Sequence, residues 1–490
     1  MTRDLSPLFD PAGVVVAGAS THPGKFGFVA LHNILASGYE GRVFATNLEG
    51  EPVLGVDTVA SIDEIPSGAA DLVFVCTPGG AVPEVLRQAA GRGIRAAFVT
   101  SAGYREAGDK GRAAEDQLVV LGEELGMVIA GPNGQGVVST PSRLCAQIVA
   151  PYPPAGSIGV VSQSGNLVSS FLNLSRVAGV GVSRAISAGN AAMLDVSEYL
   201  SWYGDDAETS VALAYVEGMS DGRAFAERVA AVTAVKPVVL LKGGATSGGQ
   251  QAAASHTGSL ATDDKVFDGA MRQAGAIRAH SVDEAFEAAA TMASQPLPRG
   301  PRVAVVTTAG GWGVLTADAL AGTDLELIDL PDDLRASIGE LVPPRWSRAN
   351  PIDLAGGETR DTVPEVLSLV ASHDTVDAVI FLGIGIQSNQ ARLLREGPFY
   401  PDHGIERIAG YHERQDQRYA RAAVEVSETT RKPVLVATEL AVADPANPGP
   451  ATLRASGRLC YPSAQRAVTA LAHAWDHTRR NGPRSERGPT

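Results

Sequence analysis

The stretch Ser157–Gly165, which reads SIGVVSQSG, gives the clearest indication of the fold class. A short apolar run ends in a turn of small residues, and a helical pattern follows, which is typical of a buried parallel strand that leads into a helix. The stretch Arg302–Gly313, RVAVVTTAGGWG, repeats this plan. Later strand segments also correspond: 211–216 to 378–383, and 236–241 to 432–437. This internal repeat predicts two similar α/β domains in the later part of the chain.

The first part of the chain has the pattern of a Rossmann-like domain. Gly13–Gly18, GVVVAG, is expected to be a buried strand, followed by a turn over 19–27 and a helix over 28–37. Further strands are predicted at 42–46, 71–77, 96–100 and 127–130. In a parallel sheet the loops that follow the strands meet at the carboxyl edge, where ligands bind.

These patterns predict an α/β protein with three domains. We expect a Rossmann-like domain at 1–150 and flavodoxin-like domains at 156–295 and 300–478, with proline-rich linkers at 151–154 and 295–300. Residues 479–490 are polar, and we expect a disordered tail there.

Composition narrows the class of function. The chain has 490 residues and a net charge of −14, which argues against nucleic acid or an anionic membrane as the main partner, while a local anion site on backbone amides stays compatible. The three cysteines, Cys76, Cys145 and Cys460, have no disulfide or metal-ligand spacing. No signal peptide or membrane span is indicated. We therefore expect a cytoplasmic protein without a metal site of its own.

His256 is the principal candidate for chemistry. It lies among small residues in the run 252–260, AAASHTGSL, after the glycine-rich stretch 242–249. A loop histidine of this kind either accepts and transfers a group or is an ordinary surface side chain. Glu217 follows the middle strand of the first repeat, and the second repeat has neither residue at the equivalent places. Because parallel strands bring their loops to one edge, Glu217 is expected within reach of the imidazole.

The run 255–260 resembles the phosphorylated motif of the NDP-forming acyl-CoA synthetases of the ADP-forming acetate–CoA ligase type, relatives of succinyl-CoA synthetase. The resemblance to their α subunit spans nearly the whole chain. It implies that His256 carries a phosphoryl group and that Glu217 stabilises it. It also implies phosphate binding at two helix N-termini, by Ser162, Gln163, Ser164, Gly165, Gly310 and Gly311.

The same resemblance implies that the first domain binds CoA. The residues that match are Gly18, Ser20, Lys25, Gly27, Asn47, Pro78, Ser101, Ala102, Gly103 and Asn133. The implied reaction interconverts acyl-CoA, ADP and phosphate with a carboxylic acid, CoA and ATP. The chain shows no ATP-grasp module, so ATP or ADP with Mg would bind to a separate β subunit, and a hetero-oligomer is expected.

Two other functions stay open from the residues. One is a non-catalytic module that binds CoA or acyl-CoA, and the other is an NAD-dependent Rossmann oxidoreductase. Against the latter, 18–23 is not a G-x-G-x-x-G motif and no acid directly ends the second strand.

Four places depart from the family pattern. The run 48–51, LEGE, is acidic, whereas the family often has a lysine soon after the asparagine of the second strand, so part of the CoA binding is expected to differ. Gly134 and Gln135 follow Asn133 where the family commonly has cysteine next, and Trp312 replaces a proline. We expect Trp312 to pack against the linker rather than to narrow a pocket. The segment 387–421 is longer than usual, and we expect a solvated excursion.

Overall fold

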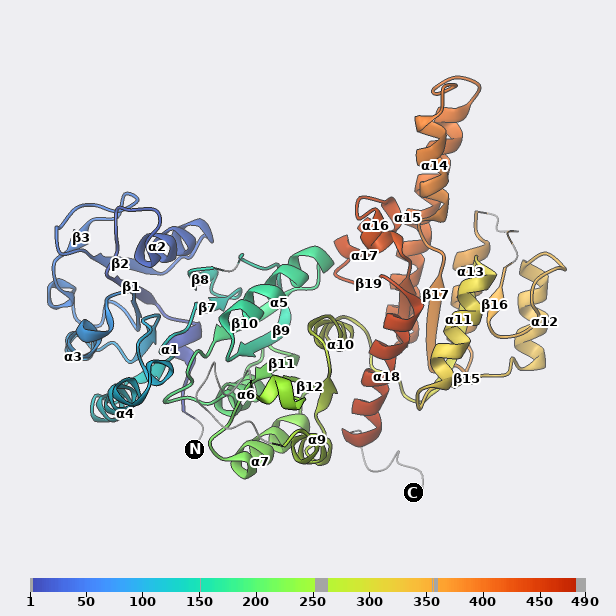
Figure 1. The fold of residues 1–490 in the computed structure, drawn as a ribbon. Helices are drawn as coiled ribbons and strands as arrows, with labels where there is room; N and C mark the ends of the chain where they lie inside the picture. Colours follow the sequence, from blue (N-terminus) through green and yellow to red (C-terminus); the bar gives the residue numbers. More distant parts are fainter. Residues whose placement is uncertain (1–2, 150, 252–262, 355, 357–359, 482–490) are drawn as a thin grey trace. The chain divides into compact units, whose positions relative to one another are not determined.

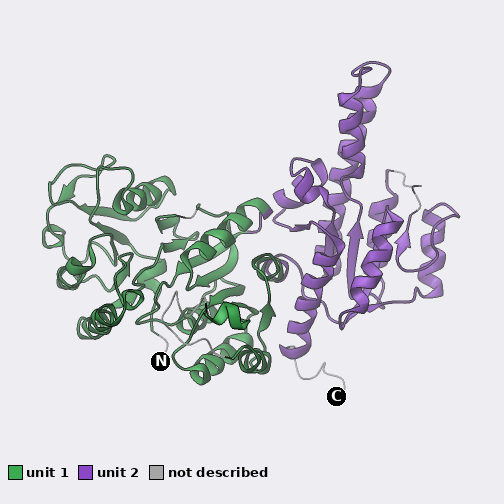
Figure 2. Cartoon of the chain, in the orientation of Figure 1, with its two compact units in different colours: residues 1–177, 181–289 green, residues 178–180, 290–490 purple. Residues whose placement is uncertain are grey.

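The computed structural model describes residues 3–149, 151–251, 263–354, 356 and 360–481 (Figure 1). The chain divides into two compact units, residues 1–177 with 181–289, and residues 290–490 with 178–180 (Figure 2). In the described part of the chain, no helix is long and apolar enough to cross a membrane.

The first sheet has the doubly wound strand order that its apolar runs predict. The order is β3-β2-β1-β4-β5-β6, and every pair is parallel. The strands are β1 (Gly13–Ala17), β2 (Arg42–Thr46), β3 (Thr58–Val59), β4 (Leu72–Val75), β5 (Ala96–Val99) and β6 (Val128–Ala130). The helices beside them include α2 (Phe26–Ala36), α3 (Val82–Gly91) and α4 (Asp109–Glu124). Helix α2 starts two residues earlier than predicted. Gly27 in its first turn lets the helix approach the turn after β1, since a Cβ there would lie 2.1 Å from the oxygen of Gly18.

The second sheet contains the first copy of the repeat. Its order is β13-β12-β11-β9-β10-β7-β8. The strands are β7 (Gly136–Ser139), β8 (Leu144–Gln147), β9 (Ala155–Ser162), β10 (Val182–Ser187), β11 (Val211–Val216), β12 (Val238–Lys242) and β13 (Ile277–Ala279). Helices α5 (Gly165–Ala178), α6 (Val196–Asp205), α7 (Gly222–Thr233) and α9 (Asp264–Gln273) lie between these strands in the chain, and α10 (Val282–Ser294) follows β13. Strands β9 to β13 are parallel in a flavodoxin-like order. The antiparallel hairpin β7–β8 extends this sheet with residues that precede 150, a pairing the sequence pattern did not predict.

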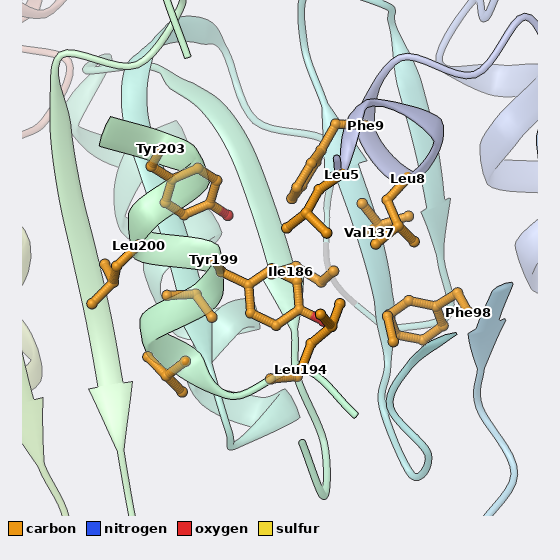
Figure 3. Packing of buried hydrophobic residues seen from close by; sticks show 14 of the residues in the cluster. Leu5, Leu8, Phe9, Phe98, Val137, Ile186, Leu194, Tyr199, Leu200 and Tyr203 are labelled. Atoms are coloured by element: carbon orange, nitrogen blue, oxygen red, sulfur yellow. The ribbon is translucent and has the colours of Figure 1, made fainter. Parts of the chain in front are cut away.

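The N-terminal segment helps to join the two sheets of unit 1. Helix α1 (Ser6–Phe9) precedes β1, and Leu5, Leu8 and Phe9 are at most 1% exposed. They belong to one apolar cluster with Tyr199 and Tyr203 of α6 (Figure 3). Since burial of a large apolar side chain contributes about 1.5–3 kcal/mol, this short segment anchors the first domain to the second sheet.

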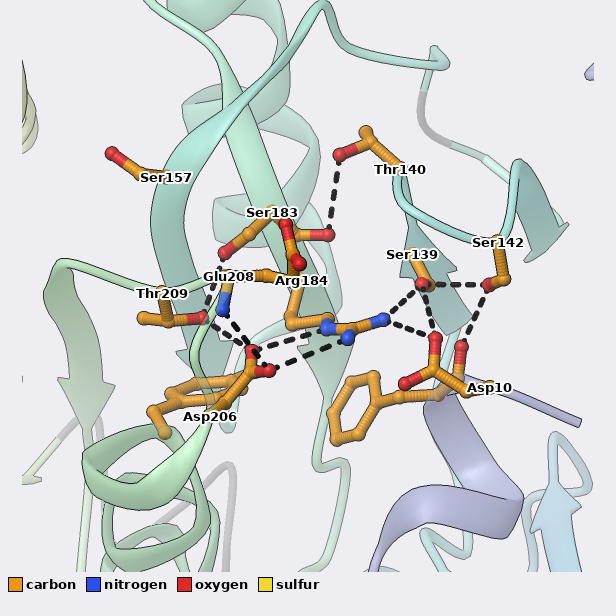
Figure 4. Close-up of polar contacts among 12 residues, drawn as sticks. Asp10, Ser139, Thr140, Ser142, Ser157, Ser183, Arg184, Asp206, Glu208 and Thr209 are labelled. Carbon is orange, nitrogen blue, oxygen red and sulfur yellow. Dashed lines mark hydrogen bonds and ion pairs between the residues drawn. The ribbon is translucent and has the colours of Figure 1, made fainter.

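A buried arginine stabilises the same junction. Arg184 of β10 is 3% exposed and forms ion pairs with Asp206 at 3.1 Å and Asp10 at 2.5 Å (Figure 4). Its guanidinium also lies 5.9 Å from the ring centre of Phe9 and 5.5 Å from that of Trp202. Asp10 follows α1 and Asp206 follows α6, so one cation holds three chain segments together.

Unit 2 contains the second copy of the repeat. Its sheet order is β15-β14-β17-β18-β19, with β16 beside β14, and all pairs are parallel. The strands are β14 (Arg302–Thr307), β15 (Glu326–Leu327), β16 (Ile352–Asp353), β17 (Ala378–Leu382), β18 (Val434–Ala437) and β19 (Cys460–Tyr461). The helices include α11 (Gly310–Ala321), α12 (Asp332–Leu341), α13 (Thr362–Ser372), α16 (Leu440–Ala443), α17 (Pro448–Ala455) and α18 (Ala464–Asn481). The order matches that of β9 to β13, so the predicted flavodoxin-like fold is confirmed.

The segment 387–421, expected as a solvated excursion, belongs to a helical hairpin of α14 (Ile386–Glu396) and α15 (Ile405–Thr430), which projects from unit 2 (Figure 1). One expectation at the end of the chain needs correction. Helix α18 continues through Arg479 to Asn481, and Arg479 pairs with Asp476 at 2.6 Å, so a disordered tail starting at 479 was wrong for these residues. Residues 482–490 lie outside the described part.

Candidate functional site

The two copies of the repeat build the same turn at the carboxyl end of their first strand. In unit 1, Ser162 Oγ donates to Ser164 O at 2.7 Å and accepts from Ser164 N at 3.1 Å. In unit 2, Thr307 Oγ1 donates to Ala309 O at 2.8 Å and accepts from Ala309 N at 3.0 Å. A hydroxyl at the last strand position thus closes each turn, and a helix begins directly after it, at Gly165 in unit 1. The free amides of such a helix start can bind an anion.

Gln163 connects this turn to Glu217. Its Oε1 accepts from the amides of Glu217 at 2.5 Å and Gly218 at 3.1 Å, and its Nε2 donates to Gly218 O at 3.0 Å. Both polar atoms of the Gln163 side chain therefore bond to the main chain of the loop after β11. Glu217 is 8% exposed, and its carboxylate accepts a hydrogen bond from Tyr215, whose pKa is raised by burial and by the nearby negative charge.

Another segment lies directly against the helix start at Gly165. A Cβ at Gly165 would lie 2.3 Å from Cδ of Gln135, which follows Asn133 and Gly134 in the chain. Gln135 Nε2 donates to Asn166 Oδ1 at 3.3 Å. The segment predicted to bind CoA thus touches the turn predicted to bind phosphate.

The equivalent glycine in unit 2 is similarly confined. A Cβ at Gly310 would lie 2.5 Å from Oδ2 of Asp353, whereas one at Gly311 would meet nothing within 4 Å. Asn350, three residues before Asp353, accepts from Val305 N at 2.9 Å and donates to Val303 O at 2.9 Å. Asn350 is thus architectural, and Asp353 borders the turn.

A cavity of about 480 Å³ lies at the carboxyl edge of the first sheet. Four of the residues predicted to bind CoA line it, namely Gly18, Ser20, Asn47 and Pro78. Gly18 has φ +85°, which favours glycine, and its amide donates to Thr46 Oγ1 at 3.1 Å. Thr77 also lines the cavity, and its buried Oγ1 has no hydrogen-bond partner among the described residues. This hydroxyl, which the sequence pattern did not single out, suits a polar ligand such as CoA.

The other residues predicted to bind CoA are not among those that line this cavity. Lys25 is the exposed residue that precedes α2, and Gly27 is buried in the helix. Ser101 Oγ donates to Thr77 O at 2.6 Å. Ala102 and Gly103 line a second cavity of about 420 Å³ beside α3 and α4.

Asn133 is the last of these residues. It is exposed, has φ +60°, and donates through Nδ2 to Asn190 Oδ1 at 3.3 Å. Asn190 follows β10 and was not predicted as a site residue, because nothing in its local sequence indicates this partner.

Trp312 borders a cavity of about 430 Å³ in unit 2, together with Leu382, Ala437 and Pro462. Leu382 and Ala437 are the last residues of β17 and β18, so this cavity lies at the carboxyl ends of these strands. Packing of Trp312 against the linker 295–300 stays a prediction.

His256 lies in 252–262, outside the described residues. The structure therefore describes the candidate partners of His256 but not the residue itself, and its distance to Glu217 stays a prediction.

Three family descriptions match parts of the chain. Residues 13–170 match a CoA binding domain, 155–292 a succinyl-CoA ligase like flavodoxin domain, and 303–385 a Ligase-CoA domain. Together they cover the Rossmann-like domain, the first copy of the repeat and the first part of the second copy, as far as residue 385.

Curated proteins and solved structures agree with these matches. The α subunit of the ADP-forming acetate–CoA ligase I of Pyrococcus furiosus is 36% identical over 75% of this chain and 82% of its own length. The α subunit of isoenzyme II is 35% identical over 77% and 81%. The dinucleotide forming acetyl-coenzyme A synthetase 1 of Ca. Korarchaeum cryptofilum, solved with phosphate and ADP, superimposes with a TM-score of 0.84 at 29% identity, over 98% of this chain and 97% of that chain. The chain therefore belongs to the family of ADP-forming acetate–CoA ligase α subunits, which are acid–thiol ligases.

Proposed function

We propose that this chain is the α subunit of an ADP-forming acyl-CoA synthetase. It would interconvert acyl-CoA, ADP and phosphate with a carboxylic acid, CoA and ATP. The observation that carries the proposal is the direct contact between the segment that includes Asn133 and Gln135 and the turn 162–165, because acyl transfer from CoA to phosphate needs both ligands at one place.

In the first step a phosphate oxygen attacks the thioester carbon of acyl-CoA. The new carbon–oxygen bond gives an acyl phosphate, the carbon–sulfur bond breaks, and the sulfur leaves as a thiolate that takes up the proton released by phosphate. Backbone amides at the start of α5 would bind the phosphate, and Ser162 holds the turn in shape. CoA would bind in the 480 Å³ cavity, beside Gly18 and Thr77.

In the second step the phosphoryl group would move from the acyl phosphate to the imidazole of His256, and the carboxylic acid would leave. Glu217 is proposed to stabilise the charged ring, and Gln163 supports this role by fixing the main chain of Glu217. Gly310 and Gly311 are proposed as a second phosphate-binding helix start. Phosphoryl transfer depends mainly on positioning and charge stabilisation, which backbone amides supply.

The nucleotide would bind elsewhere. The α-subunit names of the two Pyrococcus relatives favour a separate partner, which we propose to be an ATP-grasp β subunit that binds ADP or ATP with Mg. The complete protein would then be a hetero-oligomer, and the acyl specificity is left to experiment.

The test measures the first step on the chain alone. The chain is incubated with acetyl-CoA and phosphate, and acyl phosphate is trapped with hydroxylamine while free thiol is counted. We expect equal amounts of hydroxamate and thiol in the wild type and in Gly18→Val a large loss of both, since a Val side chain at φ +85° is strained and would block the cavity. CoA binding without any thiol release, for a panel of acyl-CoAs, would favour the non-catalytic CoA-binding module instead.

A further inference from the structure

The proposed site has two half-sites, the CoA half-site with the loops 101–105 and 131–135, and the phosphate half-site with the turn 162–165. The loop 188–192, which follows β10, contacts both of them. The amide of Ala188 donates to Ser162 O at 2.8 Å, in the turn proposed to bind phosphate. The amide of Asn190 donates to Pro132 O at 2.9 Å, next to Asn133. Gly189 has φ +56°, and a Cβ there would lie 2.3 Å from Pro132 O. The main chain of this loop therefore bonds to both half-sites, and at Gly189 it lies too close to Pro132 for a side chain.

The side chain of Asn190 adds a second connection. Its Nδ2 donates to Glu106 Oε2 at 2.6 Å and to Glu115 Oε2 at 2.7 Å, and its Oδ1 accepts from Asn133 at 3.3 Å. An amide nitrogen has two hydrogens, so each carboxylate receives one. The amide thus uses both of its donors and one acceptor position to hold three side chains of the first domain.

Glu106 connects Asn190 to the loop after β5. Its other oxygen, Oε1, accepts from the amides of Gly103 at 2.6 Å and Tyr104 at 3.2 Å. Burial alone would raise the pKa of Glu106, but the hydrogen bonds from Asn190 and Gly103 outweigh it and hold the pKa below its usual value. The carboxylate therefore stays ionised and bonded on both sides.

Glu115 fixes the neighbouring residue. It is 2% exposed, forms an ion pair with Arg105, and accepts from Arg105 N at 3.2 Å. The carboxylates of Glu106 and Glu115 thus both bond to the loop 101–105. Both also accept a hydrogen bond from the side-chain amide of Asn190.

We propose that Asn190 is a positioning residue for acyl transfer: it aligns the CoA-binding loops 101–105 and 131–135 with the phosphate-binding turn 162–165. This inference rests on the proposed function. Acyl transfer needs the thioester carbon and the phosphate oxygen within about 3–3.5 Å of each other, and a misplacement of about 1 Å can cost about 10²-fold in rate. Asn190 touches neither reacting atom, and acts through Glu106, Glu115 and Asn133.

Two partial reactions distinguish a positioning role of Asn190 from a general loss of structure in the variant. Acyl phosphate formation from acetyl-CoA and phosphate needs both half-sites. Phosphorylation of the chain by acetyl phosphate needs the phosphate half-site but no CoA. We expect Asn190→Ala to lower the first rate about 10²-fold, with the second changed less than about twofold. Asn173→Ala, an exposed asparagine on α5, is the matched control and should change neither.

Asn190→Asp tests the hydrogen bonds directly. The aspartate keeps the shape but places a third carboxylate against Glu106 and Glu115, so acyl phosphate formation at neutral pH should fall at least as far as in Asn190→Ala. It should recover partly as the pH is lowered, because protonation restores one donor; the ratio of variant to wild-type rate is the readout.

Three results would overturn the proposal. Equal losses in both partial reactions would show a merely structural role, and no loss in acyl phosphate formation would show no role. A pH-independent ratio for Asn190→Asp would remove the hydrogen-bond explanation. If the wild type performs neither partial reaction, the proposed function itself fails and this inference with it, so the two failures are distinguishable.

Discussion

Replacement of Arg184 by methionine should destabilise unit 1 strongly. The change keeps most of the volume but removes the cation that pairs with Asp206 at 3.1 Å and Asp10 at 2.5 Å. Asp206 has a side chain only 7% exposed and would remain as a buried charge without its partner. Loss of one member of a buried pair costs about 3–5 kcal/mol. The exposed pair of Arg223 with Glu227, 90% and 68% exposed, gives the control, where loss of the cation should cost less than about 0.5 kcal/mol.

Hydrogen exchange followed by mass spectrometry measures this effect locally. A loss of about 4 kcal/mol corresponds to roughly 10³-fold faster exchange of the amides in β10, since each 1.4 kcal/mol is a factor of ten. The Arg223→Met variant should exchange as the wild type does. The double variant Arg184→Met with Asp206→Asn should recover a large part of the protection, because no buried charge is then left.

The effect should also depend on pH. Burial raises the pKa of Asp206, but the hydrogen bonds and charge of Arg184 outweigh it and lower the pKa below its usual value. A carboxyl with a lowered folded pKa contributes stability above its unfolded pKa, and this stability is lost as the pH falls through the folded pKa. The difference between wild type and Arg184→Met should therefore be full at pH 7 and shrink in acid. A difference that is small at pH 7, or constant with pH, would show that the ion pair of Arg184 with Asp206 does not stabilise unit 1 in this way.

Three further predictions concern the site. Gly165→Ala should destabilise the turn by about 1–3 kcal/mol, because its Cβ would lie 2.3 Å from the Gln135 side chain, and Gln135→Ala in the same chain should restore much of the loss in thermal unfolding. Thr77→Val should weaken CoA binding about 3–10-fold in calorimetry without loss of stability, since its buried hydroxyl has no partner in the described part of the chain; unchanged affinity would contradict this. Gln163→Leu should release the main chain of Glu217 and lower phosphorylation by acetyl phosphate at least tenfold, while the Kd for CoA stays unchanged; an equal effect on both would argue for general unfolding.

The fold was largely predictable because its signals are local. Buried runs such as 157–162 and 302–307 specify the first strand of each repeat, and the small residues after them specify the turns. The β7–β8 hairpin was missed because its two strands have four residues each and lie between the strong signals of the two domains. Their apolar pattern does not show which sheet they join.

The site was predictable only where glycines and hydroxyls mark a turn. Gly18 and Ser162 are such cases, and the structure places both at carboxyl edges of parallel strands. Asn190 was missed because its partners, Glu106 and Glu115, lie 84 and 75 residues away in the sequence. A hydrogen bond between distant segments leaves no local pattern, and the fold alone brings the groups together.

The phosphoryl transfer proposed for His256 is tested by locating the phosphoryl group on the chain. The chain is incubated with labelled acetyl phosphate and Mg, and the label is tested for stability and mapped to a peptide, beside His256→Asn and, as control, His280→Asn. We predict an acid-labile, alkali-stable label on the peptide that contains His256, present in the wild type and in His280→Asn and absent from His256→Asn. No label on any of the three chains, or a label that persists in His256→Asn, would show that His256 is not the phosphoryl carrier.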